Sequence, residues 1–190
     1  LESADIVLFG ELHNNPISHW LQLELTKDLY EYKGDELILG AEMFESDNQL
    51  ILDEYMTGVI FESRFEAEAR LWPNYKTDYK PLIDFAWDKD LKFVASNVPR
   101  RYASLVNSKG FEGLEQLTED AKKFIPPLPI VYDSTLTCYQ ELLDFDGDGE
   151  VNVNFPKAQA LKDATMAHFI LENWSDEKLL LHYHGAYHSE

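Results

Sequence analysis

The chain has 190 residues, of which 45% are hydrophobic and 13% aromatic, a composition typical of a globular protein with one ordinary domain and a substantial core. With 16 basic against 35 acidic residues, its net charge of −19 repels a phosphate backbone, so we expect no nucleic-acid partner. The single cysteine, Cys138, excludes an internal disulfide and a cysteine-based zinc site. No apolar run approaches the ~20 residues that span a bilayer.

Strands and helices are predicted to alternate along the chain. Short apolar runs predict four strands, at residues 5–10, 37–44, 92–97 and 178–184. Helical periodicity predicts intervening helices at residues 16–32, 61–71, 80–88, 100–108 and 157–173. A further helix, second along the chain, is predicted to begin at about residue 48. Pro16, Pro99 and Pro156 precede or open three of them, and Ser46 with Asp47 is expected to cap the second. This order predicts one α/β domain over residues 1–190, with a mainly parallel sheet, open or partly closed, flanked by helices.

Residues 124–154 interrupt this alternation. Prolines at 126, 127 and 129 exclude a continuous helix, and residues 144–150 are acidic and glycine-rich. A short helix is predicted around residues 138–143. We expect this segment to be an irregular insertion or lid.

Polar side chains stand at the carboxyl end of every predicted strand. The first strand leads into Glu11 and His13, and the second carries Glu42 near its end. The third ends at Asn97, and the fourth ends at His182 and His184. Because parallel sheets place ligands at the carboxyl ends of their strands, we expect these side chains to converge in one polar site.

The residue types at these strand ends leave the chemistry open. Glutamate and histidine from separate strands are ligands for zinc, manganese or non-haem iron, and they are equally a general acid/base set. A lone Glu-x-His is ordinarily a capping carboxylate beside a surface histidine. The prediction of a functional site therefore depends on the convergence of the four strand ends. His19 and Gln22 share a helix face, but His13 and His19 lack the four-residue spacing of a helical zinc pair. His168 is expected to be a plain helix-face residue.

Two further patterns have a functional and a structural interpretation. Asp144, Asp146 and Asp148 match the first half of a calcium loop, but the twelfth position is Phe155, so an exposed acidic turn is an equal alternative. The aromatic group of Trp72, Tyr75 and Tyr79, near two prolines, predicts core packing or a wall for a flat ring.

Six motifs follow one another along nearly the whole chain. They are FGELHNNP at 9–16 with His19 and Gln22 after it, GAEMF at 40–44, WPNYKTDY at 72–79, NVPRR at 97–101, QALKDATMA at 159–167 and HGAYH at 184–188. In order and spacing they resemble the ChaN-like haem-binding family. That family is related to a wider superfamily of erythromycin esterases and TIKI-type metalloproteases.

The resemblance implies a haem-binding lipoprotein of the bacterial cell envelope, lipid-anchored or periplasmic, that acts in haem or iron uptake or storage. It implies two haems held face to face in a homodimer, with a tyrosine on the iron and a histidine and lysine of the partner subunit on the propionates. Tyr187, Tyr139 and Tyr79 are the candidate ligands, in that order. Any membrane attachment is expected through a lipid anchor outside this chain, which opens with neither an initiator methionine nor a signal-like segment.

The resemblance also implies the residues that build the site. Those that match the motifs are Tyr187, His188, Glu11, His13, His19, Glu42, Asn97, Arg100, Asp163 and His184. Lys157, Lys162, Arg100 and Arg101 are candidate cations for the propionates. We expect a binding protein rather than an enzyme. The alternative is a metal-dependent hydrolase in which Glu11, His13, Glu42 and His184 bind metal or activate water. A calcium-stabilised envelope domain that only binds a partner protein is a third possibility.

Overall fold

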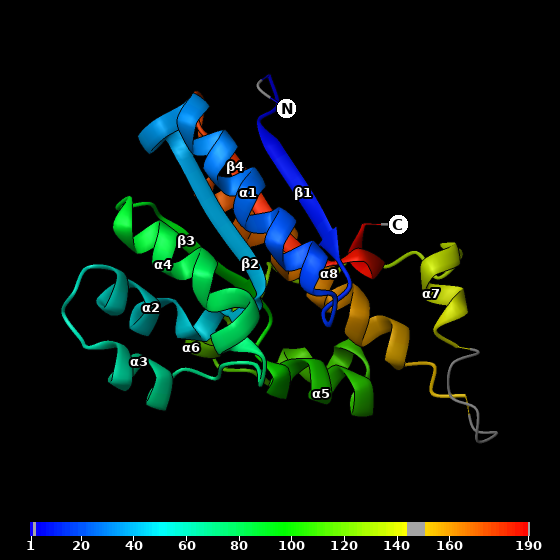
Figure 1. Cartoon of the computed structure of the whole chain (residues 1–190). Coiled ribbons are helices and arrows are strands. Elements are labelled where there is room, and N and C mark those ends of the chain that lie inside the picture. The colour runs from blue at the N-terminus through cyan, green and yellow to red at the C-terminus, as the bar shows by residue number, and fades with distance from the viewer. Residues whose placement is uncertain (2, 144–150, 190) are drawn as a thin grey trace.

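The core of the protein is a parallel sheet of four strands. The computed structural model describes residues 1, 3–143 and 151–189. The strands are β1 (Ile6–Glu11), β2 (Leu37–Glu45), β3 (Phe93–Asn97) and β4 (Leu179–Gly185). Their order in space is β1-β4-β2-β3, so the last strand lies between the first two (Figure 1). The predicted α/β class and parallel sheet are confirmed.

The strand pairing brings the carboxyl ends of the strands to one edge. Gly10 pairs with His184, and Tyr183 pairs with Ala41. Between Ala41 and Glu45 the register of β2 against β3 shifts, and Glu45 then lies opposite Asn97. The polar ends of β1, β2, β3 and β4 are therefore neighbours, although their residues are far apart in sequence.

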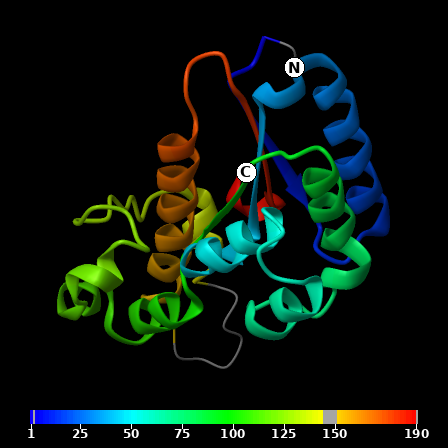
Figure 2. The same cartoon turned by 90° about the vertical axis from the view of Figure 1, so that its left-hand side faces the viewer.

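Helices cover both faces of the sheet. The helices are α1 (Pro16–Lys33), α2 (Gln49–Met56), α3 (Glu62–Glu68), α4 (Lys80–Asp88), α5 (Arg100–Lys109), α6 (Glu119–Lys122), α7 (Thr137–Glu141) and α8 (Phe155–Asn173). Helices α1 and α4 lie on one side of the sheet and α8 on the other (Figure 2). No helix in the described part of the chain is long and apolar enough to span a membrane.

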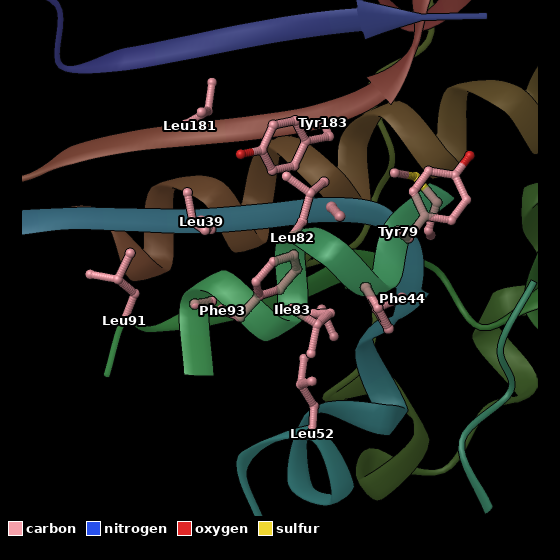
Figure 3. Close-up of a cluster of buried hydrophobic side chains, with 14 of the residues drawn as sticks. Leu39, Phe44, Leu52, Tyr79, Leu82, Ile83, Leu91, Phe93, Leu181 and Tyr183 are labelled. Carbon is pink, nitrogen blue, oxygen red and sulfur yellow. The ribbon is translucent and has the colours of Figure 1, made fainter. Parts of the chain in front are cut away.

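The main core lies between the sheet and the α1–α4 layer. Leu39, Phe93, Leu181 and Tyr183 of the strands meet Leu82 and Ile83 of α4 (Figure 3). Burial of each large apolar side chain stabilises the fold by about 1.5–3 kcal/mol. Strands β2, β3 and β4 are buried along their whole length, whereas the edge strand β1 leaves Leu8 55% exposed.

The start of α1 matches the sequence prediction, whereas the predicted cap of α2 is not found. The Asn15 side chain accepts hydrogen bonds from the first turn of α1, and Pro16 follows it. The prediction that Ser46 and Asp47 cap α2 is wrong, because they form a separate 3₁₀ turn. There the Ser46 hydroxyl donates to the Phe124 carbonyl at 2.9 Å, and Asp47 pairs with Arg70 and Arg101.

The segment predicted to be an insertion is irregular where it is described. It contains only the short helix α7, and Tyr139 of that helix donates a hydrogen bond to Asp163 of α8 at 2.7 Å. The segment is therefore tied to α8, and its role as a lid remains a prediction. The calcium candidates Asp144, Asp146 and Asp148 lie outside the described residues.

Candidate functional site

Two carboxylates organise the polar end of the sheet, each on its own face. The Glu11 cluster comprises Glu11, His13, His19, Gln22 and Tyr79 and lies on the α1 side. The Glu42 cluster comprises Glu42, Asp163, His188 and Gly185 and lies on the α8 side. The convergence predicted from the strand ends therefore occurs, but in two neighbouring groups rather than in one shared shell.

Glu11 is buried and surrounded by hydrogen-bond donors. Its Oε1 accepts from the Tyr79 hydroxyl at 2.6 Å and contacts His13 Nδ1 at 2.8 Å. Its Oε2 accepts from the Gln22 amide and lies 3.2 Å from His19 Nδ1. A buried carboxylate is tolerated only when its oxygens are satisfied in this way.

Local structure brings these donors to Glu11. Helix α1 presents His19 and Gln22 on one face because they are three residues apart. A π-helical turn, Tyr75–Tyr79, turns Tyr79 inward ahead of α4. Asn74 precedes that turn and donates to the His13 carbonyl at 3.0 Å, so the loop after β1 is fixed as well.

The Glu42 cluster contains a buried ion pair. His188 Nε2 lies 3.2 Å from Glu42 Oε1, and its Nδ1 contacts Asp163. Burial disfavours the charged imidazole, but hydrogen bonds to both carboxylates outweigh it and raise the pKa of His188 to about 9. Burial likewise works to raise the pKa of Glu42, but the charged His188 and the Gly185 N–H, 2.8 Å from Oε2, lower it to about 2. The pair is therefore ionised at neutral pH.

A chain of hydrogen bonds fixes the protons on two buried histidines. The Ser96 hydroxyl donates its one proton to the Ala41 carbonyl at 3.0 Å, so it must accept from His182 Nε2 at 2.6 Å. Burial lowers the pKa of His182 to about 3, which makes this imidazole neutral and leaves its Nδ1 an acceptor. His184 Nδ1, 3.3 Å away, must then donate. We call Ser96, His182 and His184 the histidine relay.

The relay leaves a lone pair on His184 Nε2. Burial also lowers the pKa of His184, so its ring is neutral and Nε2 carries no proton. This atom has no hydrogen-bond partner among the residues that the structure describes. His184 lines a cavity of about 100 Å³ together with His182, His188, Asp163 and apolar residues of α8. The site therefore holds a hydrogen-bond acceptor in a defined tautomer.

His13 is the member of the Glu11 cluster that lies nearest to Gly185 of the Glu42 cluster. Its ring packs edge-on against Trp72, with centroids 4.8 Å apart, and its hydrogen bond to Glu11 is the main cause of a raised pKa. A Cβ on Gly185 would lie 2.8 Å from His13 Nε2, so only glycine at this position lets the ring approach β4. Tyr75 and Tyr79 are buried in the main core and Trp72 packs against it, so the core-packing interpretation of this aromatic group is confirmed.

A larger cavity opens at the strand ends. It has a volume of about 460 Å³, and its wall includes His13, Glu42, Asn97, Arg100 and Lys162. Arg100 pairs with Glu45, which is also held by Arg70, and Arg101 pairs with Asp47. The two arginines expected to bind propionates therefore already hold carboxylates. Lys157 donates to Asn154 at 2.9 Å, and Lys162 lowers the pKa of Glu42 through its charge.

The three candidate tyrosines differ in their surroundings. Tyr79 is 1% exposed, and this burial, together with the hydrogen bond that Tyr79 donates to Glu11, raises the pKa of its phenol. Burial and the bond to Asp163 raise the pKa of Tyr139. Tyr187 is 39% exposed and lines a recess of about 210 Å³ with Leu142, Phe155 and Gln159. Only Tyr187 of the three combines solvent access with an apolar recess.

The described residues contain no group of three or more histidine, cysteine, aspartate or glutamate side chains placed to hold a metal ion. Glu11 and Glu42, which the hydrolase alternative puts in one shell, have separate partners. The hydrolase alternative therefore stays a prediction. His168 contacts Glu172 one turn along α8, as expected for a helix-face residue.

Sequence reasoning missed three residues of the site. Ser96 of the relay lies in a short buried strand, where a polar residue requires a partner, and that was the available signal. Gln159 was noted only within a motif, although its amide nitrogen lies 3.2 Å from His188 Nδ1. Asn74 had no individual signal, because its role depends on where the loop after β1 lies.

Three solved structures with similar folds represent two kinds of protein. ChaN of Campylobacter jejuni, described for its cofacial haem binding, matches with a TM-score of 0.71 and 19% identity over 98% of this chain and 72% of its own. Two structures described as bacterial protein toxins match with TM-scores of 0.52 at 14% and 16% identity. They cover 97% and 99% of this chain but 28% and 29% of their own. At these identities the matches establish the fold.

A curated relative and a family model complete the comparison. Protein RETICULATA-RELATED 5, chloroplastic, of Arabidopsis thaliana is 25% identical over 93% of this chain. The chain spans about a quarter of the length of that relative, since the match covers 26% of it. The family model described as "Haem-binding uptake, Tiki superfamily, ChaN" matches residues 1–190. The chain therefore belongs to the ChaN family of haem-binding uptake proteins within the Tiki superfamily.

Proposed function

We propose that this protein binds haem at the recess beside Tyr187, with the Tyr187 phenolate on the iron. The observation that carries the proposal is the placement of Tyr187 at 39% exposure next to an apolar hollow. Phe155 and Leu142 supply apolar contact for a flat ring, and a phenolate is a hard anionic ligand suited to ferric iron. These residues fit the group that the family is known for.

The Glu42 cluster would position this ligand. Tyr187 and His188 belong to one short turn, Ala186–His188, at the end of β4. The His188 side chain is buried and held by Glu42 and Asp163, so the turn is anchored from inside while Tyr187 is directed outward. Tyr139 of α7 binds the second oxygen of Asp163, which ties the wall of the recess to the same anchor. The buried ion pair thus fixes the position of an exposed phenol.

Haem bound here would supply the iron chemistry, and this chain would supply the ligand, the apolar wall and cations. Lys157, on the first turn of α8 and two residues after Phe155, is the cation we assign to a propionate. Because Arg100 and Arg101 pair with Glu45 and Asp47, they are not assigned this role. A flat ring on an open recess leaves its second face uncovered, which supports a homodimer with two haems face to face.

A haemin titration tests the proposal. Wild-type protein is titrated with haemin and monitored in the Soret region, and free and loaded protein are compared by size-exclusion chromatography. We expect saturable binding of one haem per chain and a shift toward a dimer. Absence of saturable binding would overturn the proposal. Saturable binding without a change in size would support haem binding and contradict the proposed dimer.

We also propose a role in haem or iron uptake at a bacterial cell envelope, with a lipid anchor or a periplasmic location. Membership in a haem-binding uptake family supports this role. The plant relative bears a chloroplast designation, so a plastid location is the competing outcome. Fractionation of cells that express the native precursor separates the two, and recovery with plastid membranes would contradict the envelope location.

A further inference from the structure

A second hollow lies far from the polar strand ends. With a volume of about 610 Å³ it exceeds the cavities beside the site, and we call it the aromatic–acidic groove. It is lined by Tyr55, Gly58, Ile60, Phe61, Glu62, Asp84, Trp87 and Asp88. These residues belong to α2, α4, the loop between α2 and α3 and the first residue of α3, at the opposite side of the molecule from α7 and the C-terminus (Figure 1). Haem bound beside Tyr187 would not reach this groove.

The groove exposes large apolar side chains in a defined conformation. Phe61 is 83% exposed, Val59 is 72% exposed and Trp87 is 52% exposed. The loop that carries the first two is held by hydrogen bonds from Val59 N and Ile60 N to the Glu54 carbonyl, at 2.8 and 3.2 Å. Gly58, at φ +73°, permits the reversal of the chain. Clustered, ordered apolar side chains on a surface mark a place where another molecule binds.

The rim of the groove is acidic. Glu62, Asp84 and Asp88 line it, whereas none of its lining residues is basic. Lys80 pairs with both Glu62 and Asp84, at 3.2 and 2.6 Å, and Lys89 pairs with Asp88 at 2.8 Å. Three carboxylates therefore share two lysines, in a protein whose net charge is −19. The local potential favours a cation and repels an anionic ligand.

We propose that the aromatic–acidic groove binds a short basic segment of a partner protein, in which an apolar side chain neighbours lysine or arginine. Phe61 and Ile60 receive the apolar side chain. The Trp87 ring can accept the cation on its face, with Asp84 and Asp88 beside it. Because three carboxylates share two lysines here, a purely apolar partner would cover the excess negative charge without compensating it. A second copy of this chain, with 35 acidic against 16 basic residues, is a poor source of such a basic segment.

The test uses a labelled synthetic peptide in which arginine alternates with leucine, added to the whole protein. Fluorescence anisotropy gives the affinity, and amide NMR shifts locate the peptide. We expect saturable binding, with shifts at Gly58 and the Trp87 indole, that weakens about tenfold in Phe61→Ser and in Trp87→Ala. Trp20→Ala, which removes an exposed tryptophan of α1, is the matched control and should bind as wild type.

Charge is tested separately. Asp88→Asn should weaken binding about threefold, whereas Asp120→Asn should leave it unchanged, because Asp120 forms a similar lysine pair far from the groove. A peptide in which glutamate alternates with leucine should not bind. No binding of the arginine peptide, shifts located elsewhere, or equal binding by Trp87→Ala and Trp20→Ala would overturn the proposal. If the protein self-associates and Phe61→Ser abolishes this association, the occupant of the groove would be a second copy of the chain and not a basic segment.

Discussion

Glu11 and Glu42 are both buried carboxylates at the end of the same sheet, yet they are stabilised in different ways. Glu11 receives a phenol, an amide and two imidazoles, and Glu42 receives a backbone N–H and a charged histidine. The first arrangement fastens β1, α1 and the turn before α4 to one another. The second anchors the turn that carries Tyr187. We infer that Glu11 serves mainly the fold, whereas Glu42 and His188 serve mainly the ligand site.

The largest expected effect comes from removing the Glu11 carboxylate. Glu11→Ala leaves the buried Tyr79 hydroxyl and the Gln22 amide without their acceptor, so we expect a loss of about 4 kcal/mol in the free energy of unfolding. Urea denaturation measures it. Glu11→Gln keeps one carbonyl oxygen, so its free energy of unfolding should lie between those of Glu11→Ala and wild type. If Glu11→Ala does not fold, the loss in Glu11→Gln relative to wild type tests the prediction. Glu24→Ala, at an exposed pair with Lys27, should change stability by less than about 0.5 kcal/mol.

Disrupting the Glu42 cluster should lower the free energy of unfolding by less, and the loss should depend on pH. The folded pKa of His188 is raised from 6.5 to about 9, so its stabilisation is complete below pH 6.5 and is lost as pH rises through 9. The folded pKa of Glu42 is lowered from 4.5 to about 2, so its contribution is complete above pH 4.5 and is lost as pH falls through 2. Stability from this pair should therefore be greatest between pH 4.5 and 6.5.

The variant His188→Gln tests this ion pair. It should lower the free energy of unfolding by about 3 kcal/mol at pH 6, because Glu42 and Asp163 lose their cation. It should also flatten the decline in stability between pH 6.5 and 9 seen for wild type. His168→Gln is the matched control, since His168 lies on the outside of α8 beside Glu172. An unchanged pH slope in His188→Gln would contradict the assignment.

The smallest effect is expected in the histidine relay. Ser96→Ala removes the acceptor for His182 Nε2, which should cost about 1 kcal/mol and release the fixed tautomer of His184. Imidazole ¹⁵N NMR of wild type should show His184 protonated only on Nδ1 at neutral pH, and the variant should show a mixture. Ser108→Ala, at an exposed helix position, should leave the spectrum unchanged. A wild-type His184 protonated on Nε2 would contradict the relay.

Some parts of this architecture were predictable and others were not. The four strands and α4 were predicted within one or two residues, because apolar runs and the proline near the start of α4 mark them. The division of the site into two clusters was not predicted. It depends on β4 entering between β1 and β2, and on the register that places His184 beside Gly10, and neither is encoded in local periodicity. The 3₁₀ turn at Ser46 depends equally on the distant Phe124 carbonyl.

The most direct test of Tyr187 as the haem ligand is haemin binding by Tyr187→Phe, compared with wild type and with Tyr32→Phe, which alters an exposed tyrosine at the far end of α1. We expect wild type and Tyr32→Phe to show the same saturable Soret change with a phenolate-to-iron charge-transfer band. Tyr187→Phe should lose that band and bind at least about tenfold more weakly. An unchanged spectrum and affinity in Tyr187→Phe would contradict the assignment.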